Sequence, residues 1–288
     1  MKTLREYIED AKDRKVAIGH FNISDLAGLK GIFEAAKELD LPVLIGLSEG
    51  ERSFVGAKNA ADLVRNLREQ YDYPIFTNAD HTHSLEKIQE AVEAGFDAVL
   101  FDAGKLPFEE NIQKTKEVVE WVRKTRPEVL IEAELGYLGT SSTILKEVPE
   151  GAAITLEDLT KPEEAKRFVE ETGIDLLAPA VGNIHGMFKD APNPNLFIER
   201  IAELRDAAGV PMVLHGGSGI RNDDFTAAIA NGISIVHINT EIRLAWRNGM
   251  ERALKEMPDE VTPYKLLLDP VEEVKKVVTD RLKLFNGK

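Results

Sequence analysis

The sequence predicts an α/β protein of the (β/α)8 TIM-barrel class with an extra C-terminal helix. From about residue 17 to about residue 256, short apolar runs alternate with longer stretches of helical periodicity. Alternating βα units imply a parallel sheet, and about eight of them in about 250 residues fit a closed barrel. A doubly wound open sheet is the alternative, but no GxGxxG follows the first strand-like run. Since no linker or low-complexity segment interrupts the series, we expect one domain over residues 1–288.

The strand-like runs are short and apolar, and three of them begin at a proline, where a missing N–H does little harm. In chain order they are 17–22, 42–48, 74–80, 98–103, 129–136, 176–182, 211–217 and 233–239. Between them, segments such as 85–94 and 109–124 carry apolar residues at helical spacing. Four glycines stand where a helix would end, namely Gly95, Gly173, Gly209 and Gly232.

The segment after Pro258 is charged, with apolar residues at helical spacing from Val271 to Leu284. This pattern predicts the extra helix, packed either on the barrel or on a neighbouring subunit.

The composition excludes several classes of protein. A chain of 288 residues can bury a sizeable core, and the absence of cysteine excludes disulfides, thiolate metal sites and a cysteine nucleophile. The net charge of -14 argues against a nucleic-acid or anionic-membrane partner. No apolar run reaches the ~20 residues of a membrane span. Residues 1–15 lack the apolar stretch of a secretory signal, so we expect a soluble cytoplasmic protein.

All six histidines lie within or just beyond the C-terminal part of a predicted strand: His20, His81, His83, His185, His215 and His237. In a barrel these strand ends converge on the face that carries the active site. Such clustering favours metal binding or proton transfer, although a lone histidine is more often structural. Without cysteine, a transition metal would use imidazole and carboxylate ligands. We interpret His20 and His83 as structural or supporting residues.

Carboxylates accompany the histidines. Asp80 directly precedes His81, Asp102 ends the fourth strand, and Glu132 and Glu134 share one face of the fifth strand. A structural ion pair inside the barrel is the alternative for Glu132.

Two turns follow the last two predicted strands, at 213–219 (Val-Leu-His-Gly-Gly-Ser-Gly) and 238–241 (Ile-Asn-Thr-Glu). Small residues let backbone N–H groups approach an anion, and in barrels these two loops often hold a phosphate. The placement of the turns therefore predicts a phosphate site.

Five separated segments form a series along the chain. They are 78–81 (Asn-Ala-Asp-His), 106–111 (Leu-Pro-Phe-Glu-Glu-Asn), 132–136 (Glu-Ala-Glu-Leu-Gly), 181–186 (Val-Gly-Asn-Ile-His-Gly) and 214–218 (Leu-His-Gly-Gly-Ser). In this order they resemble the class II, zinc-dependent fructose-bisphosphate and tagatose-bisphosphate aldolases. The resemblance extends from Phe21 to about Trp246 and is more specific for the superfamily than for the substrate.

The resemblance implies a role for each matching residue. His81, His185 and His215 would bind a catalytic Zn²⁺. Asp80 would handle the proton of the substrate C4 hydroxyl as acid and base. Glu132 matches a carboxylate near the metal that is an alternative ligand position.

The resemblance also implies a substrate site with two phosphate ends. A triose phosphate would be bound near a monovalent cation, Na⁺ or K⁺, by Gly186, Gly216, Ser218 and Thr240. Lys189 matches a phosphate-binding lysine, whereas Ser48 and Arg243 match residues for the other phosphate. In the family that arginine reaches in from the adjacent subunit. Asn22 and Asn239 complete the substrate-binding set.

The sequence departs from the family in two places. Where the aldolases carry an acidic residue on a mobile loop, segment 140–143 reads Thr-Ser-Ser-Thr, and Glu147 is the nearest acid beyond it. His237 stands where the family has an asparagine, and Asn239 where an aspartate or alanine distinguishes fructose from tagatose substrates. We hypothesise that His237 is catalytic and takes over proton transfer or carbonyl polarisation; the alternative is that it only packs.

The predicted function is a metal-dependent aldolase that cleaves a ketose bisphosphate to dihydroxyacetone phosphate and an aldehyde phosphate. Fructose 1,6-bisphosphate is the leading substrate, and tagatose bisphosphate or another phosphorylated ketose is the alternative. A metal-dependent hydrolase and a non-catalytic sugar-phosphate binder on the same barrel are the competing classes. The expected partner is a small phosphorylated sugar, and the expected assembly a homodimer or homotetramer.

Overall fold

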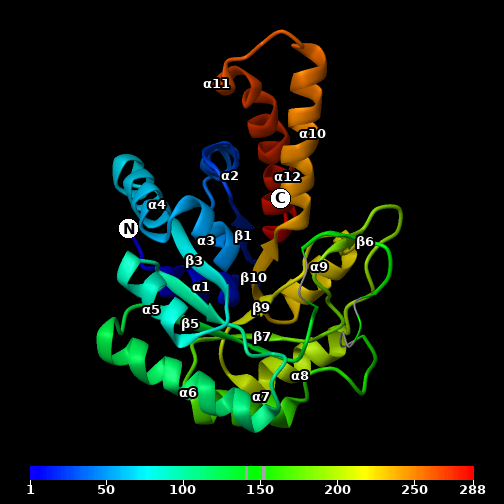
Figure 1. The fold of residues 1–288 in the computed structure, drawn as a ribbon. Helices are drawn as coiled ribbons and strands as arrows, with labels where there is room; N and C mark the ends of the chain where they lie inside the picture. The colour runs from blue at the N-terminus through cyan, green and yellow to red at the C-terminus, as the bar shows by residue number, and fades with distance from the viewer. Residues whose placement is uncertain (140–141, 149, 151–153) are drawn as a thin grey trace.

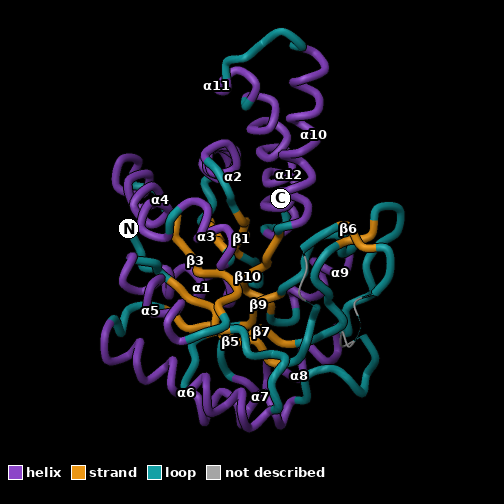
Figure 2. The backbone as a smooth tube through the Cα atoms, viewed as in Figure 1, coloured by secondary structure: helices purple, strands orange, loops and turns teal. Residues whose placement is uncertain are grey.

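A closed barrel of eight parallel strands forms the centre of the computed structural model, which describes residues 1–139, 142–148, 150 and 154–288 (Figures 1 and 2). The barrel strands are β1 (Ile18–Asn22), β2 (Val43–Leu47), β3 (Ile75–Thr82), β4 (Ala98–Phe101), β5 (Leu130–Leu135), β7 (Leu176–Pro179), β9 (Met212–Leu214) and β10 (Ile233–Ile238). Their order is β1-β10-β9-β7-β5-β4-β3-β2, and β2 pairs with β1 to close the ring. Each strand lies inside or overlaps one predicted run, so the (β/α)8 prediction is confirmed.

Helices surround the barrel in Figure 1. They are α1 (Leu4–Arg14), α2 (Leu26–Leu39), α3 (Glu49–Val55), α4 (Ala57–Tyr71), α5 (Leu85–Ala94), α6 (Phe108–Thr125), α7 (Pro162–Thr172), α8 (Ile198–Ala208), α9 (Asn222–Ala230), α10 (Thr240–Glu256), α11 (Pro263–Leu266) and α12 (Leu268–Phe285). Gly95, Gly173 and Gly209 cap α5, α7 and α8 in the left-handed conformation. Gly232 lies one residue beyond the C-cap of α9. The glycine positions therefore marked the helix ends correctly.

The N-terminal helix α1 fills one end of the barrel. Leu4, Ile8 and Ala11 of α1 are buried in one apolar cluster with side chains from the barrel strands. The strand members of this cluster include Ile18, Leu44, Phe76, Ala98, Leu130, Leu176, Val213 and Ile235. Because side chains two residues apart share a face of a strand, the next inward layer lies two residues later. That layer is where the polar residues begin.

The C-terminal helices form a projecting arm. Figure 1 shows α10, α11 and α12 extending away from the barrel. The inner part of α12 packs on the barrel of its own chain, where Val274, Val278 and Leu282 are buried. The predicted extra helix therefore packs on the barrel, while the tip of the arm carries exposed apolar side chains.

A small two-stranded sheet was not expected from the sequence. Strand β6 (Ile144–Leu145) pairs in parallel with β8 (Met187–Phe188), beside the mouth of the barrel. Within the part of the chain that the structure describes, every helix is too short or too polar to cross a lipid bilayer.

Candidate active site

The polar residues of the barrel interior form two layers beyond the apolar cluster at α1. Alternation along the strands places the first polar layer two residues beyond Ile18, Phe76, Leu130, Val213 and Ile235. Its members are His20, Asn78, Glu132, His215 and His237, all buried. Two residues further come Asn22, Asp80, Glu134 and Asn239. These residues surround the mouth formed by the carboxyl ends of the strands.

Asp80 and His81 lie at an irregularity in strand β3. The register with β4 shifts between Ala79 and Thr82, and His81 has a positive φ of 36°. A bulge re-aims side chains, and a strained non-glycine backbone persists only where the surroundings hold it. The irregularity lets two consecutive side chains, Asp80 and His81, both line the same pocket.

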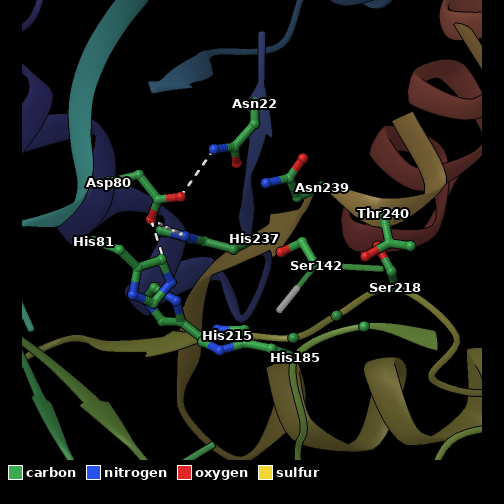
Figure 3. Close-up of a pocket in the computed structure, with 13 residues that line it drawn as sticks. Asn22, Asp80, His81, Ser142, His185, His215, Ser218, His237, Asn239 and Thr240 are labelled. Carbon is green, nitrogen blue, oxygen red and sulfur yellow. Dashed lines mark hydrogen bonds and ion pairs between the residues drawn. The ribbon is translucent and has the colours of Figure 1, made fainter. Parts of the chain in front are cut away.

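The structure brings the three predicted metal ligands together. The ring centroids of His81 and His185 are 4.6 Å apart, and those of His81 and His215 are 5.0 Å apart. One candidate ligand atom from each of these three histidines and from Glu134 lies within 4.8 Å of the others. Figure 3 shows the imidazoles converging beside Asp80.

Hydrogen bonds leave one nitrogen of each ring free for a metal. Nδ1 of His185 donates to the carbonyl of Gly139 at 2.8 Å, and its buried Nε2 has no hydrogen-bond partner within the described part of the chain. Nδ1 of His81 lies 2.8 Å from Asp102, while Nε2 of His215 lies 2.6 Å from Glu132. Such partners fix the tautomer of metal-binding imidazoles. The donor set therefore fits a divalent cation held by imidazole and carboxylate.

The two carboxylates of β5 take different places. Glu134 shares one set of candidate metal-ligand atoms with His81, His185 and His215. Glu132 shares a second set with His215 and His237. Glu132 orients the ring of His215 through the contact with Nε2, and Glu134 is the carboxylate grouped with all three predicted histidine ligands. Burial raises the pKa of Glu132 to about 8 and that of Glu134 well above its usual value.

The charges around the imidazoles attract a cation. Burial lowers the pKa of His185 to about 4 and that of His215 well below its ordinary value, so both rings are neutral. Burial also opposes a charge on His81, but Asp80, with Asp102 and Glu134, outweighs it and raises its pKa to about 10. Carboxylates that favour a proton on His81 also favour a divalent ion in its place.

Asp80 has one oxygen anchored and one free. Its Oδ2 accepts a hydrogen bond from Nδ2 of Asn22 at 2.9 Å. Its Oδ1 is buried, has no hydrogen-bond partner among the described residues and lies 3.4 Å from Nδ1 of His237. Burial alone would raise the pKa of Asp80, but His81 and His237 hold it well below the usual value. Asp80 is therefore an ionised carboxylate with an oxygen ready to accept a proton.

His237 is buried at the site and stacks on His20. Their ring centroids are 3.4 Å apart and nearly parallel, and His237 also lies 4.0 Å from the ring of His215. The stack needs a glycine at position 46, because a Cβ there would lie 2.1 Å from His20. The structure thus places His237 in the same pocket as Asp80 and His81.

The residues predicted for the triose phosphate line a common inner pocket beside the imidazoles. Its walls include Gly186 and Gly216. They also include Ser218, Asn239 and Thr240, which Figure 3 labels. Gly216 has a φ of 60°, and a Cβ there would lie 2.1 Å from the carbonyl oxygen of Ile184. Thr240 begins α10, where an anion is favoured by the helix N-terminus.

An outer cavity of about 290 Å³ adjoins the inner pocket and contains Ser48 and Arg243. Arg243 binds Glu51 and the carbonyl of Ser142 within its own chain, at 2.7 Å and 3.0 Å. Arg243 therefore reaches this cavity without an adjacent subunit. Lys189, the other predicted phosphate ligand, is exposed and lines neither the inner pocket nor the outer cavity.

The segment with the missing acid is partly described. Thr140 and Ser141 lie outside the described residues, whereas Ser142 lines the inner pocket and Glu147 is exposed.

Sequence reasoning missed two buried charges on α3. Glu51 accepts hydrogen bonds from Asn22 and Ser48, and Arg52 donates to the carbonyl of Asp80 at 3.0 Å. The Ser-x-x-Glu pattern at 48–51 is a capping-box signature that could have revealed Glu51. The pattern alone could not show that the helix start faces the site.

Comparisons with known proteins agree with this geometry. A family model described as "Fructose-bisphosphate aldolase class-II" matches residues 2–288. The chain is 34% identical over 288 residues to the fructose-bisphosphate aldolase of Geobacillus stearothermophilus, covering 99% of this chain and 96% of that protein. It is 35% identical to the probable fructose-bisphosphate aldolase of Bacillus subtilis, covering 99% and 97%.

A solved structure shows the same architecture. The crystal structure of the YdjI aldolase from Escherichia coli K12 has a TM-score of 0.82 and 33% sequence identity, covering 98% of this chain and 96% of that chain. The family model and these relatives span nearly the whole chain. The chain therefore belongs to the class II fructose-bisphosphate aldolase family, whose members are metal-dependent lyases.

Proposed function

We propose that this chain is a zinc-dependent aldolase that cleaves a phosphorylated ketose between C3 and C4. One observation carries the proposal: within the described residues, three imidazoles that each use one nitrogen in a hydrogen bond and an ionised aspartate with one unbonded oxygen line one pocket. The relatives named fructose-bisphosphate aldolase make fructose 1,6-bisphosphate the first substrate to test. We also propose that residues 1–288 form one catalytic domain, supported by the family match over residues 2–288.

His81, His185 and His215 would hold the metal, with Glu134 beside them. Zn²⁺ suits neutral imidazoles and carboxylate better than Mg²⁺ or Ca²⁺, which prefer oxygen ligands. When bound, a divalent ion polarises the substrate carbonyl and stabilises the negative charge that appears when the C3–C4 bond breaks.

Asp80 accepts the proton of the C4 hydroxyl through its free Oδ1 in the cleavage direction. The hydrogen bond from Asn22 to Oδ2 fixes the orientation of the carboxylate, and the low pKa keeps it ionised. His237, 3.4 Å from Oδ1, is placed to share this proton or to donate one at C3. This neighbour offers a substitute for the acid that segment 140–143 lacks.

The remaining predicted residues bind and orient the substrate. Gly186, Gly216, Ser218 and Thr240 would hold the triose phosphate at the start of α10, with Na⁺ or K⁺ nearby. Asn239 lines the same pocket. Fixing the phosphate and the carbonyl together makes bond cleavage effectively unimolecular.

We further propose a cytoplasmic homodimer or homotetramer that binds neither nucleic acid nor membrane. The acidic net charge of -14 supports the absence of a nucleic-acid partner. The arm supports self-association, because Val261 and Tyr264 at its tip are 86% and 70% exposed. A Val261→Glu/Tyr264→Glu variant should lower the mass measured by light scattering. Leu156→Glu, at an exposed site away from the arm, is the matched control.

A coupled cleavage assay before and after chelation tests the catalytic proposal. Dihydroxyacetone phosphate should form from fructose 1,6-bisphosphate, disappear as a product after chelation and return with added Zn²⁺. Replacing Na⁺ by K⁺ or Li⁺ tests the monovalent cation. Cleavage that survives chelation, or that traps a lysine adduct with borohydride, would reject the mechanism.

A further inference from the structure

The two ends of the site present their anion-binding groups differently. At the triose-phosphate end, defined by Gly186, Gly216, Ser218 and Thr240, the described residues lining the pocket include no glutamate, and Asp80, the carboxylate among them, accepts its hydrogen bond from Asn22. At the far end, defined by Ser48 and Arg243, a glutamate already binds both residues. This glutamate is Glu51, whose side chain is 7% exposed.

Glu51 uses the donors that a second phosphate would need. Its Oε2 accepts from the backbone N–H and the hydroxyl of Ser48, at 2.8 and 2.9 Å, and from Nδ2 of Asn22 at 2.9 Å. Its Oε1 accepts from Nη2 of Arg243 at 2.7 Å. The other terminal nitrogen of Arg243 donates to Ser142. Glu51 lines a neighbouring cavity with Asn22 and Arg243, so its carboxylate lies behind Ser48 and Arg243 and occupies their donors.

The charge of the outer cavity points the same way. Among the described residues lining it, Arg243 is the only lysine or arginine, and Glu49 lies beside Ser48. A phosphate dianion reaching for Ser48 and Arg243 would meet the buried charge of Glu51 at close range. Like-charge juxtaposition of this kind is how sites reject a competing ligand. An uncharged hydroxyl of an aldehyde can hydrogen-bond in the outer cavity without this repulsion.

We propose that Glu51 is a specificity-determining residue that makes the far end favour an uncharged, hydroxylated aldehyde over an aldehyde phosphate. The proposal rests on the proposed aldolase function and narrows its substrate class at one end. A bisphosphate is then cleaved less efficiently than the ketose that carries only the triose phosphate.

A purely structural role for Glu51 makes a different prediction. Glu51 is the third residue of α3 and completes a capping box with Ser48. Since glutamine also serves in a capping box, Glu51→Gln keeps the cap and removes the charge. If Glu51 only caps α3, substrate preference stays unchanged in this variant.

The test compares two aldehydes that differ only in the phosphate. The metal-loaded enzyme condenses dihydroxyacetone phosphate with either glyceraldehyde or glyceraldehyde 3-phosphate, and kcat/KM is measured for each aldehyde. Wild type should use glyceraldehyde at least as well as its phosphate. Glu51→Gln should raise the phosphate-to-glyceraldehyde ratio at least tenfold, mainly through KM for the phosphate. Glu6→Gln, in the capping box of α1 with Thr3, should leave the ratio unchanged.

The outcomes separate the inference from the proposed function. A wild-type preference for glyceraldehyde 3-phosphate over glyceraldehyde, or an unchanged ratio in Glu51→Gln, overturns the specificity proposal and leaves the aldolase intact. If neither aldehyde consumes dihydroxyacetone phosphate with any metal, the aldolase proposal fails and the inference fails with it. The wild-type ratio decides the matter even if the variant does not fold.

Discussion

The barrel mouth and the C-terminal arm use charged and polar side chains in opposite ways. Among the described residues, buried side-chain atoms without hydrogen-bond partners gather at the mouth, on residues such as His20, Asp80, Glu134, His185 and His237. Several ionic groups of the arm are exposed or half-buried and paired with one another. Examples are Arg252 with Asp269 and Lys265 with Glu260.

The difference separates function from stability. A buried polar group without a partner costs about 1–3 kcal/mol, so several of them in one place indicate a site arranged for a ligand. Exposed ion pairs contribute little to stability individually. The mouth is therefore maintained at a cost that its ligands offset, whereas the arm is locally satisfied.

Removing a metal ligand should break this contrast most completely. His185→Ala deletes Nε2, which no described residue hydrogen-bonds, and we expect loss of both bound metal and activity. Loss of a residue that only hydrogen-bonds a ligand lowers metal affinity by about 10- to 100-fold. The metal content of His185→Ala after dialysis should show a larger loss. His83→Ala, at a 58% exposed ring, should retain the metal. Equal metal content in the two variants would contradict the assignment.

Asp80→Asn should remove the proton acceptor while keeping the metal. General acid–base groups contribute about 10²–10⁴-fold, so kcat for cleavage should fall within that range. Asp175→Asn is the matched control, because Asp175 is a half-buried carboxylate that pairs with Arg5 and Arg123. The two variants should separate cleanly in kcat. Cleavage at the wild-type rate in Asp80→Asn would remove Asp80 from the mechanism.

His237 offers a finer test of the mouth. If it exchanges the C3 proton, His237→Asn and His237→Ala should slow exchange of that proton in dihydroxyacetone phosphate by about 10²-fold, the lower end of the general acid–base range. The measurement is loss of the proton signal in D₂O with metal-loaded protein. Wild-type exchange in both variants would leave His237 as a packing residue against His20.

The smallest effect is expected in the arm. Hydrogen bonds from Lys265 and then Thr262 lower the pKa of Glu260 to about 2 from an ordinary 4.5. A depressed folded pKa stabilises the protein above the unfolded pKa, and this stabilisation is lost as pH falls from about 4.5 through about 2. Glu260→Gln should therefore lower Tm slightly at pH 6 and not at pH 2. Asp259 forms no side-chain hydrogen bond within the described residues, so Asp259→Asn controls for loss of charge alone. A Tm difference between Glu260→Gln and wild type that does not change with pH would contradict the assignment.

The strands and the histidine cluster could be predicted because both follow from alternation. Parallel strands place their carboxyl ends together, so histidines at those ends converge whatever the loops do. Glu132 was predicted as a carboxylate near the metal, but a period of two gives Glu132 and Glu134 the same face and not their depth. The pattern therefore could not show that Glu134 is the one grouped with all three predicted histidine ligands. Lys189 was predicted to bind phosphate, but the structure leaves it exposed.

Glu51 and the β6–β8 pair escaped prediction for a different reason. A capping box is a local pattern, and whether it faces solvent or the barrel mouth depends on how α3 follows β2. Pairing of Ile144 with Met187 joins two loops far apart in sequence, with two residues in each strand. The capping box and the two-residue strands are each too short to give a hydrophobic periodicity that would predict their place in the fold.

Helix α1 closes one end of the barrel, so substrate and products pass through the mouth at the other end. Because Leu4, Ile8 and Ala11 fill the closed end, the sugar phosphate enters and both cleavage products leave by the same route. Anything lodged in that opening blocks entry and exit alike. A ligand bound at the rim of the mouth would therefore inhibit the enzyme without contacting the residues deeper in the barrel.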